Sequence, residues 1–196
     1  MGGLLYLNPT KHDKKKTMQP IIITGGPGAG KTSLLSALAQ RGYMAFTEVS
    51  RTLIRQQAAL DDGILPWTDL PRFAALCLEA MGEQRQQAMC GTMPAFVDRA
   101  IGDICAYLVI GGEAVAQHYI EAAKGYYPTV FCCAPNQAIY VQDDERPHTF
   151  AEAEAIHRQL KQTYSELGYQ VVEVPWDTVD NRASWVLAQM RQAEKA

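Results

Sequence analysis

A glycine-rich segment that ends in a lysine and a threonine is the first stretch of this chain whose residue types suggest chemistry. Residues 25–32 read GGPGAGKT, between the apolar run IIIT and helix-forming residues. Such glycines let backbone N–H groups surround phosphate oxygens, while the lysine reaches the β- and γ-phosphates and the threonine hydroxyl ligates Mg²⁺. The segment predicts a nucleoside triphosphate site, although a plain glycine-rich turn before a helix is the alternative. The expected phosphate-binding residues are Gly25, Gly26, Pro27, Gly28, Ala29, Gly30, Lys31, Thr32 and Ser33.

An aspartate at the end of another apolar run is the second feature. Asp98 closes AFVD and is followed by Arg99. A carboxylate there can hold Mg²⁺, beside Thr32, or act as a base. Hydrolytic motors usually place a glutamate next, to orient water, whereas a cation suits an anionic substrate or a transferring phosphoryl group. The pair therefore favours transfer over hydrolysis, with an ordinary strand-end aspartate in a surface ion pair as the alternative.

A glutamate after a further apolar run is the third feature. Glu48 opens EVSRTLIR, and Arg51 and Arg55 follow at i+3 and i+7 on the same helical face. Glu48 could face an acceptor molecule and take its hydroxyl proton. The spacing is explained equally well by a glutamate at a helix start that the helix dipole stabilises and that pairs with Arg51. The sequence leaves open whether Glu48 or Asp98 is the base.

Other polar and aromatic residues are candidates for an acceptor pocket. Asp103 and Tyr107 follow Asp98 at helical spacing, although Asp103 would also suit a helix N-terminus. Trp67, Phe73 and Tyr107 could stack on a planar substrate, but aromatic residues at such spacing more often belong to the core. The residues expected to bind the acceptor are Glu48, Arg51, Arg99, Asp103 and Tyr107.

A polar segment over about residues 135–150 is the fourth feature. It is rich in charges and carries Arg146. Phosphoryl-transferring proteins with this kind of loop place a lid at this point, and its arginine neutralises charge in the transition state. The expected catalytic residues are thus Lys31, Glu48, Asp98 and Arg146, unless the segment is only a solvated loop.

Alternating strand and helix patterns must position these residues. The strands are predicted at 20–24, 43–47, 94–98, 129–133 and 169–174. Helices are predicted at 32–40, 48–60, 69–89, 100–110, 113–124 and 149–167, with a last one that Asp180 could cap. Thr68 is the expected N-cap of 69–89, and Thr149 with Glu152 forms a capping box. This alternation predicts a three-layer α/β domain whose strand ends converge on one cleft.

Composition limits the function classes. The chain has 196 residues, 47% of them hydrophobic, and a net charge of −3. Residues 1–18 are predicted to form a flexible basic arm and 19–196 a single domain. The acidic body argues against nucleic-acid binding, and no apolar run would span a membrane. Five unpaired-looking cysteines favour a reducing, cytoplasmic setting. A homodimer remains compatible with the sequence.

Five stretches together resemble a known group of P-loop proteins. They are GGPGAGKTSLLSAL, TEVSRTLI, FVDRAIGDICAYL, IYVQDDERPHTFAEAEAIHRQL and YSELGYQVVEVP, within residues 20–190. The chain resembles the group classified as AAA-type ATPase domains and is similar to the nicotinamide riboside kinase domain of bacterial NAD regulators.

This resemblance implies a nucleoside-kinase-like P-loop NTPase fold with a five-stranded parallel sheet in the order 2-3-1-4-5. It implies ATP and Mg²⁺, with Glu48 and Asp98 as the acidic pair and Arg146 as the lid arginine. The expected activity is transfer of the γ-phosphate to a small nucleoside-like acceptor. A regulatory ATP-binding module that gates a protein partner is the alternative.

Overall fold

A five-stranded parallel sheet in the order β2-β3-β1-β4-β5 lies at the centre of the computed structural model, which describes residues 18–140 and 148–193. The strands are β1 (Ile21–Gly25), β2 (Met44–Phe46), β3 (Ala95–Asp98), β4 (Thr129–Cys133) and β5 (Gln170–Val174). Every residue of the three central strands is buried, which explains their apolar runs. The predicted sheet order is confirmed.

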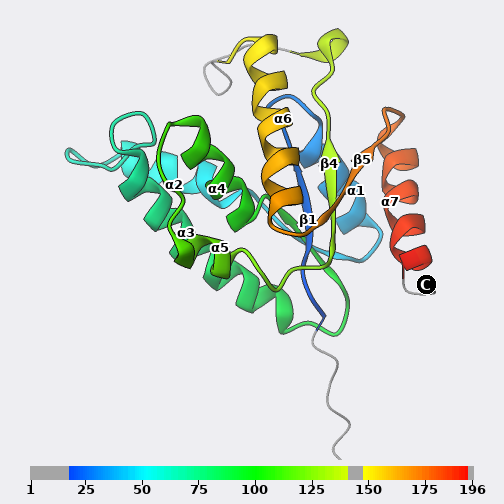
Figure 1. The fold of residues 1–196 in the computed structure, drawn as a ribbon. Coiled ribbons are helices and arrows are strands. Elements are labelled where there is room, and N and C mark those ends of the chain that lie inside the picture. The colour runs from blue at the N-terminus through cyan, green and yellow to red at the C-terminus, as the bar shows by residue number, and fades with distance from the viewer. Residues whose placement is uncertain (1–17, 141–147, 194–196) are drawn as a thin grey trace, which may run out of the picture.

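Helices cover both faces of this sheet (Figure 1). Ile21 and Ile23 of β1 pack in one core cluster with α1 (Lys31–Gln40) and α7 (Val179–Ala193). Ile22 points the opposite way and shares a cluster with Tyr164 of α6 (Phe150–Glu166). Alternation along one strand thus fills both layers, as the three-layer prediction requires.

The remaining helices, α2 (Val49–Ala58), α3 (Leu70–Met89), α4 (Ile101–Ile110) and α5 (Gln117–Ala122), lie together beside the sheet (Figure 1). Phe73, Cys77 and Met81 of α3 are buried in a cluster with α4 residues, which places Phe73 in the core. Gln84 interrupts this apolar stripe because its side-chain amide donates to the carbonyl oxygen of Thr47 at 3.0 Å. Helix α3 therefore holds the segment that carries Glu48.

Two predicted N-caps were wrong by one or two residues. Asp69, and not Thr68, caps α3, since its carboxylate accepts from the Arg72 backbone N–H at 3.1 Å. Thr68 bonds instead within the preceding turn, to Leu65. Helix α7 begins at Val179, so that Asp180 lies in its first turn. Both differences arise because neighbouring polar residues compete for one cap.

Other boundaries differ in length or are confirmed. The helix predicted at 113–124 is only α5, Gln117–Ala122, and a short 3₁₀ helix (Gln137–Ile139) follows β4. The capping box of Thr149 and Glu152 is confirmed at the start of α6. Gly168, at φ +87°, ends that helix in the left-handed conformation.

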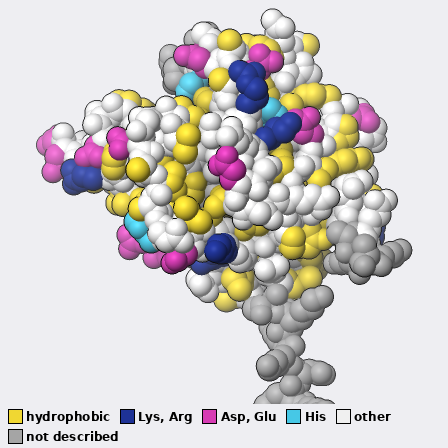
Figure 2. All heavy atoms as spheres, viewed as in Figure 1, with side chains coloured by type: hydrophobic (Ala, Val, Ile, Leu, Met, Phe, Trp, Pro, Cys, Tyr) yellow, Lys and Arg dark blue, Asp and Glu magenta, His cyan; other side chains and the backbone are white. Residues whose placement is uncertain are grey.

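The surface is mixed in charge. Acidic and basic side chains are interspersed over the face drawn in Figure 2. Within residues 18–140 and 148–193, no helix is long and apolar enough to cross a membrane. Cys90 is exposed and the other four cysteines are buried, all of them free.

Candidate functional site

The glycine-rich loop connects β1 to α1 and leaves the start of that helix open. Gly25 takes φ +137°, and a Cβ there would lie 2.0 Å from the carbonyl oxygen of Cys133 on the neighbouring strand. Gly30 is the N-cap of α1, and no side chain caps the helix. The first N–H groups of α1 are therefore available to an anion, and the helix dipole favours one.

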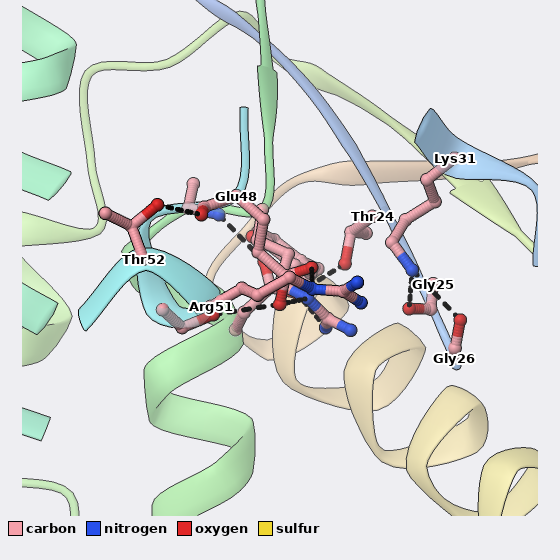
Figure 3. Close-up of polar contacts among 12 residues, drawn as sticks. Thr24, Gly25, Gly26, Lys31, Glu48, Arg51 and Thr52 are labelled. Carbon is pink, nitrogen blue, oxygen red and sulfur yellow. Dashed lines mark hydrogen bonds and ion pairs between the residues drawn. The ribbon is translucent and has the colours of Figure 1, made fainter. Parts of the chain in front are cut away.

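Lys31 lies over the loop that it follows (Figure 3). Its Nζ donates to the carbonyl oxygens of Gly25 and Gly26, each at 3.0 Å, and the side chain is buried. Burial lowers the Lys31 pKa, and the nearby Arg99 lowers it further. A buried ammonium held by carbonyl groups at a helix start is well placed to meet phosphate oxygens.

Asp98 presents a buried carboxylate at the end of β3. It is opposite Ile23 in the sheet and 3% exposed, and its Oδ1 has no hydrogen-bond partner among the described residues. Burial raises its pKa to about 6, although Lys31 and Arg99 oppose the rise. An orphaned carboxylate oxygen that shares a cavity with the Thr32 hydroxyl fits Mg²⁺, which prefers few protein ligands and keeps waters and phosphates.

Arg99 connects the acidic residues of the site. Its Nε donates to Glu48 Oε1 at 3.0 Å and its Nη1 to Asp103 Oδ1 at 3.1 Å. Its backbone has φ 65°, a left-handed conformation that is costly for a residue with a side chain. The guanidinium also lies 5.6 Å from the centre of the Tyr107 ring. The strand end is thus strained to bring one cation between two carboxylates.

Glu48 occupies the N-cap position of α2 but does not cap it through its side chain. Its carboxylate instead accepts from Arg99 and from the Ser50 hydroxyl at 2.9 Å, and lies 3.8 Å from Arg51 (Figure 3). Burial would raise its pKa, but Arg99 and Lys31 outweigh burial and lower it to about 2. Glu48 is consequently a carboxylate throughout the neutral range.

Asp103 of α4 is fully buried and contacts Arg99. Four donors fill its two oxygens: the Thr24 and Tyr164 hydroxyls, each at 2.6 Å, Arg99, and the Ala100 backbone N–H. Asp103 does not line the cavity between α1, the end of β2 and α2. Its geometry suits a residue that holds Arg99 in place. Thr24 could have been recognised as the one hydroxyl in an apolar strand run, whereas no local pattern connects Asp103 with Tyr164, 61 positions away.

A cavity of about 400 Å³ opens between α1, the end of β2 and α2. It brings together Thr32, Glu48, Arg51 and Asp98, which the sequence placed in one site. Its complete lining is Thr32, Leu35, Ser36, Ala39, Ala45, Phe46, Thr47, Glu48, Arg51, Thr52, Arg55 and Asp98. The loop threonine Thr32 and the acidic residues Glu48 and Asp98 therefore border one open cavity.

Other predicted residues lie elsewhere. Tyr107 is partly buried and contacts the guanidinium of Arg99 rather than the cavity. Trp67 is 69% exposed, before α3. Arg146, with residues 141–147 of the expected lid, lies outside the described residues, so its role stays a prediction.

Arg182 of α7 is a neighbour of the loop that the sequence analysis missed. Its Nη2 donates to the carbonyl oxygen of Ala29 at 3.2 Å, and its guanidinium lies 4.7 Å from the Trp176 ring centre. The side chain is 2% exposed. Nothing in the local sequence signals this contact, because it joins residues 153 positions apart.

Solved structures share this fold at low identity. A thymidylate kinase from Ehrlichia chaffeensis is 16% identical, with 88% of this chain and 99% of that chain covered and a TM-score of 0.54. The shikimate kinase from Acinetobacter baumannii with shikimate is 14% identical, with coverages of 90% and 95% and a TM-score of 0.50.

The NadR protein in complex with NR is 15% identical, with a TM-score of 0.64, and the match covers 91% of this chain and 51% of that chain. The chain thus spans about half of NadR. No curated protein sequence matches the chain. A family model described as an AAA domain matches residues 20–182, which include the glycine-rich loop, Glu48 and Asp98. The chain therefore belongs to this AAA domain family and has the P-loop kinase-like fold that the resemblance predicted.

Proposed function

We propose that this protein transfers the γ-phosphate of ATP to a hydroxyl group of a small, nucleoside-like acceptor. The observation that carries the proposal is the cavity of about 400 Å³, because Glu48 lines it together with Thr32 and Asp98. An acceptor in that cavity would lie next to the end of the triphosphate. The kinase folds among the structural neighbours, including NadR with NR, support the same reaction class.

Each residue has a physical role in this proposal. The N–H groups of the loop and Lys31 bind the β- and γ-phosphates, and Thr32 and Asp98 hold Mg²⁺. When bound, Mg²⁺ neutralises charge on the phosphate oxygens. Phosphoryl transfer depends mainly on positioning and electrostatic stabilisation, so that Glu48 acts chiefly by orienting the acceptor hydroxyl and receiving its proton late.

Glu48 suits that role better than Asp98 does. Its pKa of about 2 keeps it ionised, and Arg99 fixes one oxygen at 3.0 Å. The Asp98 carboxylate has an unpartnered buried oxygen that a hydrated cation would satisfy. The two acids thereby receive different tasks, one for the acceptor and one for the metal.

The experiment measures ATP consumption by the purified chain with and without each of a panel of nucleosides that includes nicotinamide riboside. We expect acceptor-dependent turnover, and we expect Glu48→Gln to reduce it by about 10²- to 10⁴-fold while ATP binding persists. Glu154→Gln, at an exposed position on α6, is the matched control.

Absence of acceptor-dependent turnover, with equal residual hydrolysis in wild type and Glu48→Gln, would contradict the proposal. Capture of a protein partner that requires bound nucleotide but survives Glu48→Gln would instead favour the regulatory ATP-binding module.

A further inference from the structure

One face of α2 lines the cavity beyond the position of the transferring phosphate. Four residues at helical spacing border this cavity: Glu48, Arg51, Thr52 and Arg55. Arg55 is seven positions after Glu48, which corresponds to a rise of about 10 Å along the helix. The cavity therefore offers a carboxylate for a hydroxyl group and, about one nucleoside length away, a second polar region.

The charges of this cavity are not balanced within the protein. Its acids are Glu48 and Asp98, and its cations are Arg51 and Arg55. Glu48 is already paired at 3.0 Å with Arg99, which does not line the cavity, and at 3.8 Å with Arg51, which does. Asp98 is assigned to the metal in the proposal above. The charge of Arg55 is therefore left for a ligand to neutralise.

Arg55 is the cation that a ligand would meet. Its Nε donates to the carbonyl oxygen of Arg51, one turn earlier, at 3.5 Å. No carboxylate of the described part of the chain lies within 4.0 Å of its guanidinium. An arginine in this state keeps most of its donors for an incoming group, and its planar fork matches phosphate or carboxylate oxygens.

The cavity walls between Glu48 and Arg55 are apolar and suit the uncharged middle part of a ligand. Leu35 and Ala39 of α1 and Ala45 and Phe46 of β2 contribute apolar surface to the cavity. A ring or sugar could lie against them while its ends reach Glu48 and Arg55. Pockets of this kind bind through apolar contacts and take their specificity from a few polar groups.

From this arrangement we infer that the acceptor is an anion: a hydroxyl-bearing small molecule whose far end carries a phosphate or carboxylate bound by Arg55. The inference rests on the proposed function and deepens it, because it narrows the acceptor from any nucleoside-like molecule to one with a negative group. It makes Arg55 a specificity-determining residue.

The test uses the full chain saturated with AMP-PNP and Mg²⁺, so that the phosphate-binding loop is filled. Matched sets of hydroxyl compounds, each a neutral nucleoside with its 3′-monophosphate and its carboxylate counterpart, are titrated by calorimetry. We expect one anionic form to bind at least about tenfold more tightly than its neutral partner. The two anionic arms identify whether phosphate or carboxylate is recognised.

Arg55→Gln should abolish this preference, and with ATP it should raise the KM of the anionic acceptor while kcat and the KM for ATP stay within about twofold. Arg191→Gln, at an exposed position on α7, is the matched control and should keep the preference.

The inference is overturned if no set shows an Arg55-dependent preference, including the case in which nothing binds. Turnover with neutral nucleosides that is unaffected by Arg55→Gln would overturn it while the proposed function stands. An Arg55-dependent anion preference without acceptor-dependent ATP turnover would leave the anion site in place and contradict the proposed function.

Discussion

Arg99 is the residue on which the acidic groups of the site depend. It donates to Glu48 and Asp103, and Asp103 is in turn held by the hydroxyls of Thr24 and Tyr164. A buried charge is stable only when it is paired and hydrogen-bonded, so that this chain of contacts fixes the Glu48 carboxylate from below. Arg99 is thus a positioning residue that acts through Glu48.

Replacing Arg99 should change the pH dependence of the proposed reaction. Arg99 makes the largest contribution that lowers the Glu48 pKa to about 2, and burial opposes it. In Arg99→Met the pKa should rise toward its ordinary value near 4.5 or above, because burial remains. In the proposed reaction both Glu48 and Asp98 act as carboxylates, and Arg99 lowers the pKa of each, so that in Arg99→Met the acidic limb of the kcat/KM profile should move to higher pH.

The size of that movement can be graded. Ser50→Ala removes a smaller contribution to the Glu48 pKa and should move the limb less. Arg99→Lys keeps the positive charge and should return the limb to its wild-type pH. It should not restore kcat, because an ammonium group cannot donate to Glu48 and Asp103 in the planar geometry of the guanidinium. A limb that stays in place in Arg99→Met would show that neither Glu48 nor Asp98 is the group that titrates.

At the scale of elements, the packing of α4 against α6 brings Asp103 to Tyr164. Gly102 of α4 makes this approach possible, because a Cβ there would lie 2.4 Å from a ring carbon of Tyr164. The ring is fully buried and its hydroxyl donates to Asp103 at 2.6 Å. A contact between two helices therefore supports the network under the site.

Gly102→Ala should destabilise the protein by about 1–3 kcal/mol, because overpacking against a buried ring outweighs the gain in helix propensity. Gly82→Ala on α3 is the matched control. No atom lies within 4 Å of a Cβ at that position, so that this substitution should stabilise by about 0.5–1 kcal/mol. Urea unfolding of both variants measures the difference. Equal stability gains in the two would contradict the packing argument.

Features that depend only on residues close together in the sequence could be predicted best. The glycine-rich loop, the buried strands and the capping box at Thr149 depend on neighbouring residues, and they could be predicted from local patterns. The assignments of Asp103 and Tyr107 could not be refined, because their burial depends on α6 packing against α4. Arg182 was missed for the same reason, since its contact with Ala29 joins distant parts of the chain.

At the scale of the whole molecule, one buried histidine joins three elements next to the loop. His157 of α6 lies 3.6 Å from the Cys132 sulfur on β4 through Nδ1 and 3.3 Å from Glu173 on β5 through Nε2. Lys161 also bonds Glu173. Burial lowers the His157 pKa, although Glu173 opposes the shift. Protonation of the histidine is thus unfavourable in the folded protein.

This histidine should make folding stability depend on pH just below neutrality. The unfolded chain binds a proton near pH 6.5, while the folded chain binds it only at lower pH, so that stability is complete above 6.5 and falls as pH decreases toward the folded pKa. Glu173, whose pKa is lowered from 4.5, adds a second loss in a more acidic window.

His157→Gln should therefore reduce the slope of unfolding free energy between pH 7.5 and 5.5, by at most about 1.4 kcal/mol per pH unit. Urea unfolding at a series of pH values measures the slope, and the same substitution at the exposed His118 of α5 serves as the control. A wild-type slope in His157→Gln would mean that another group governs stability in this range. A reduced slope would show that His157 takes up a proton when the chain unfolds and links stability to pH in this range.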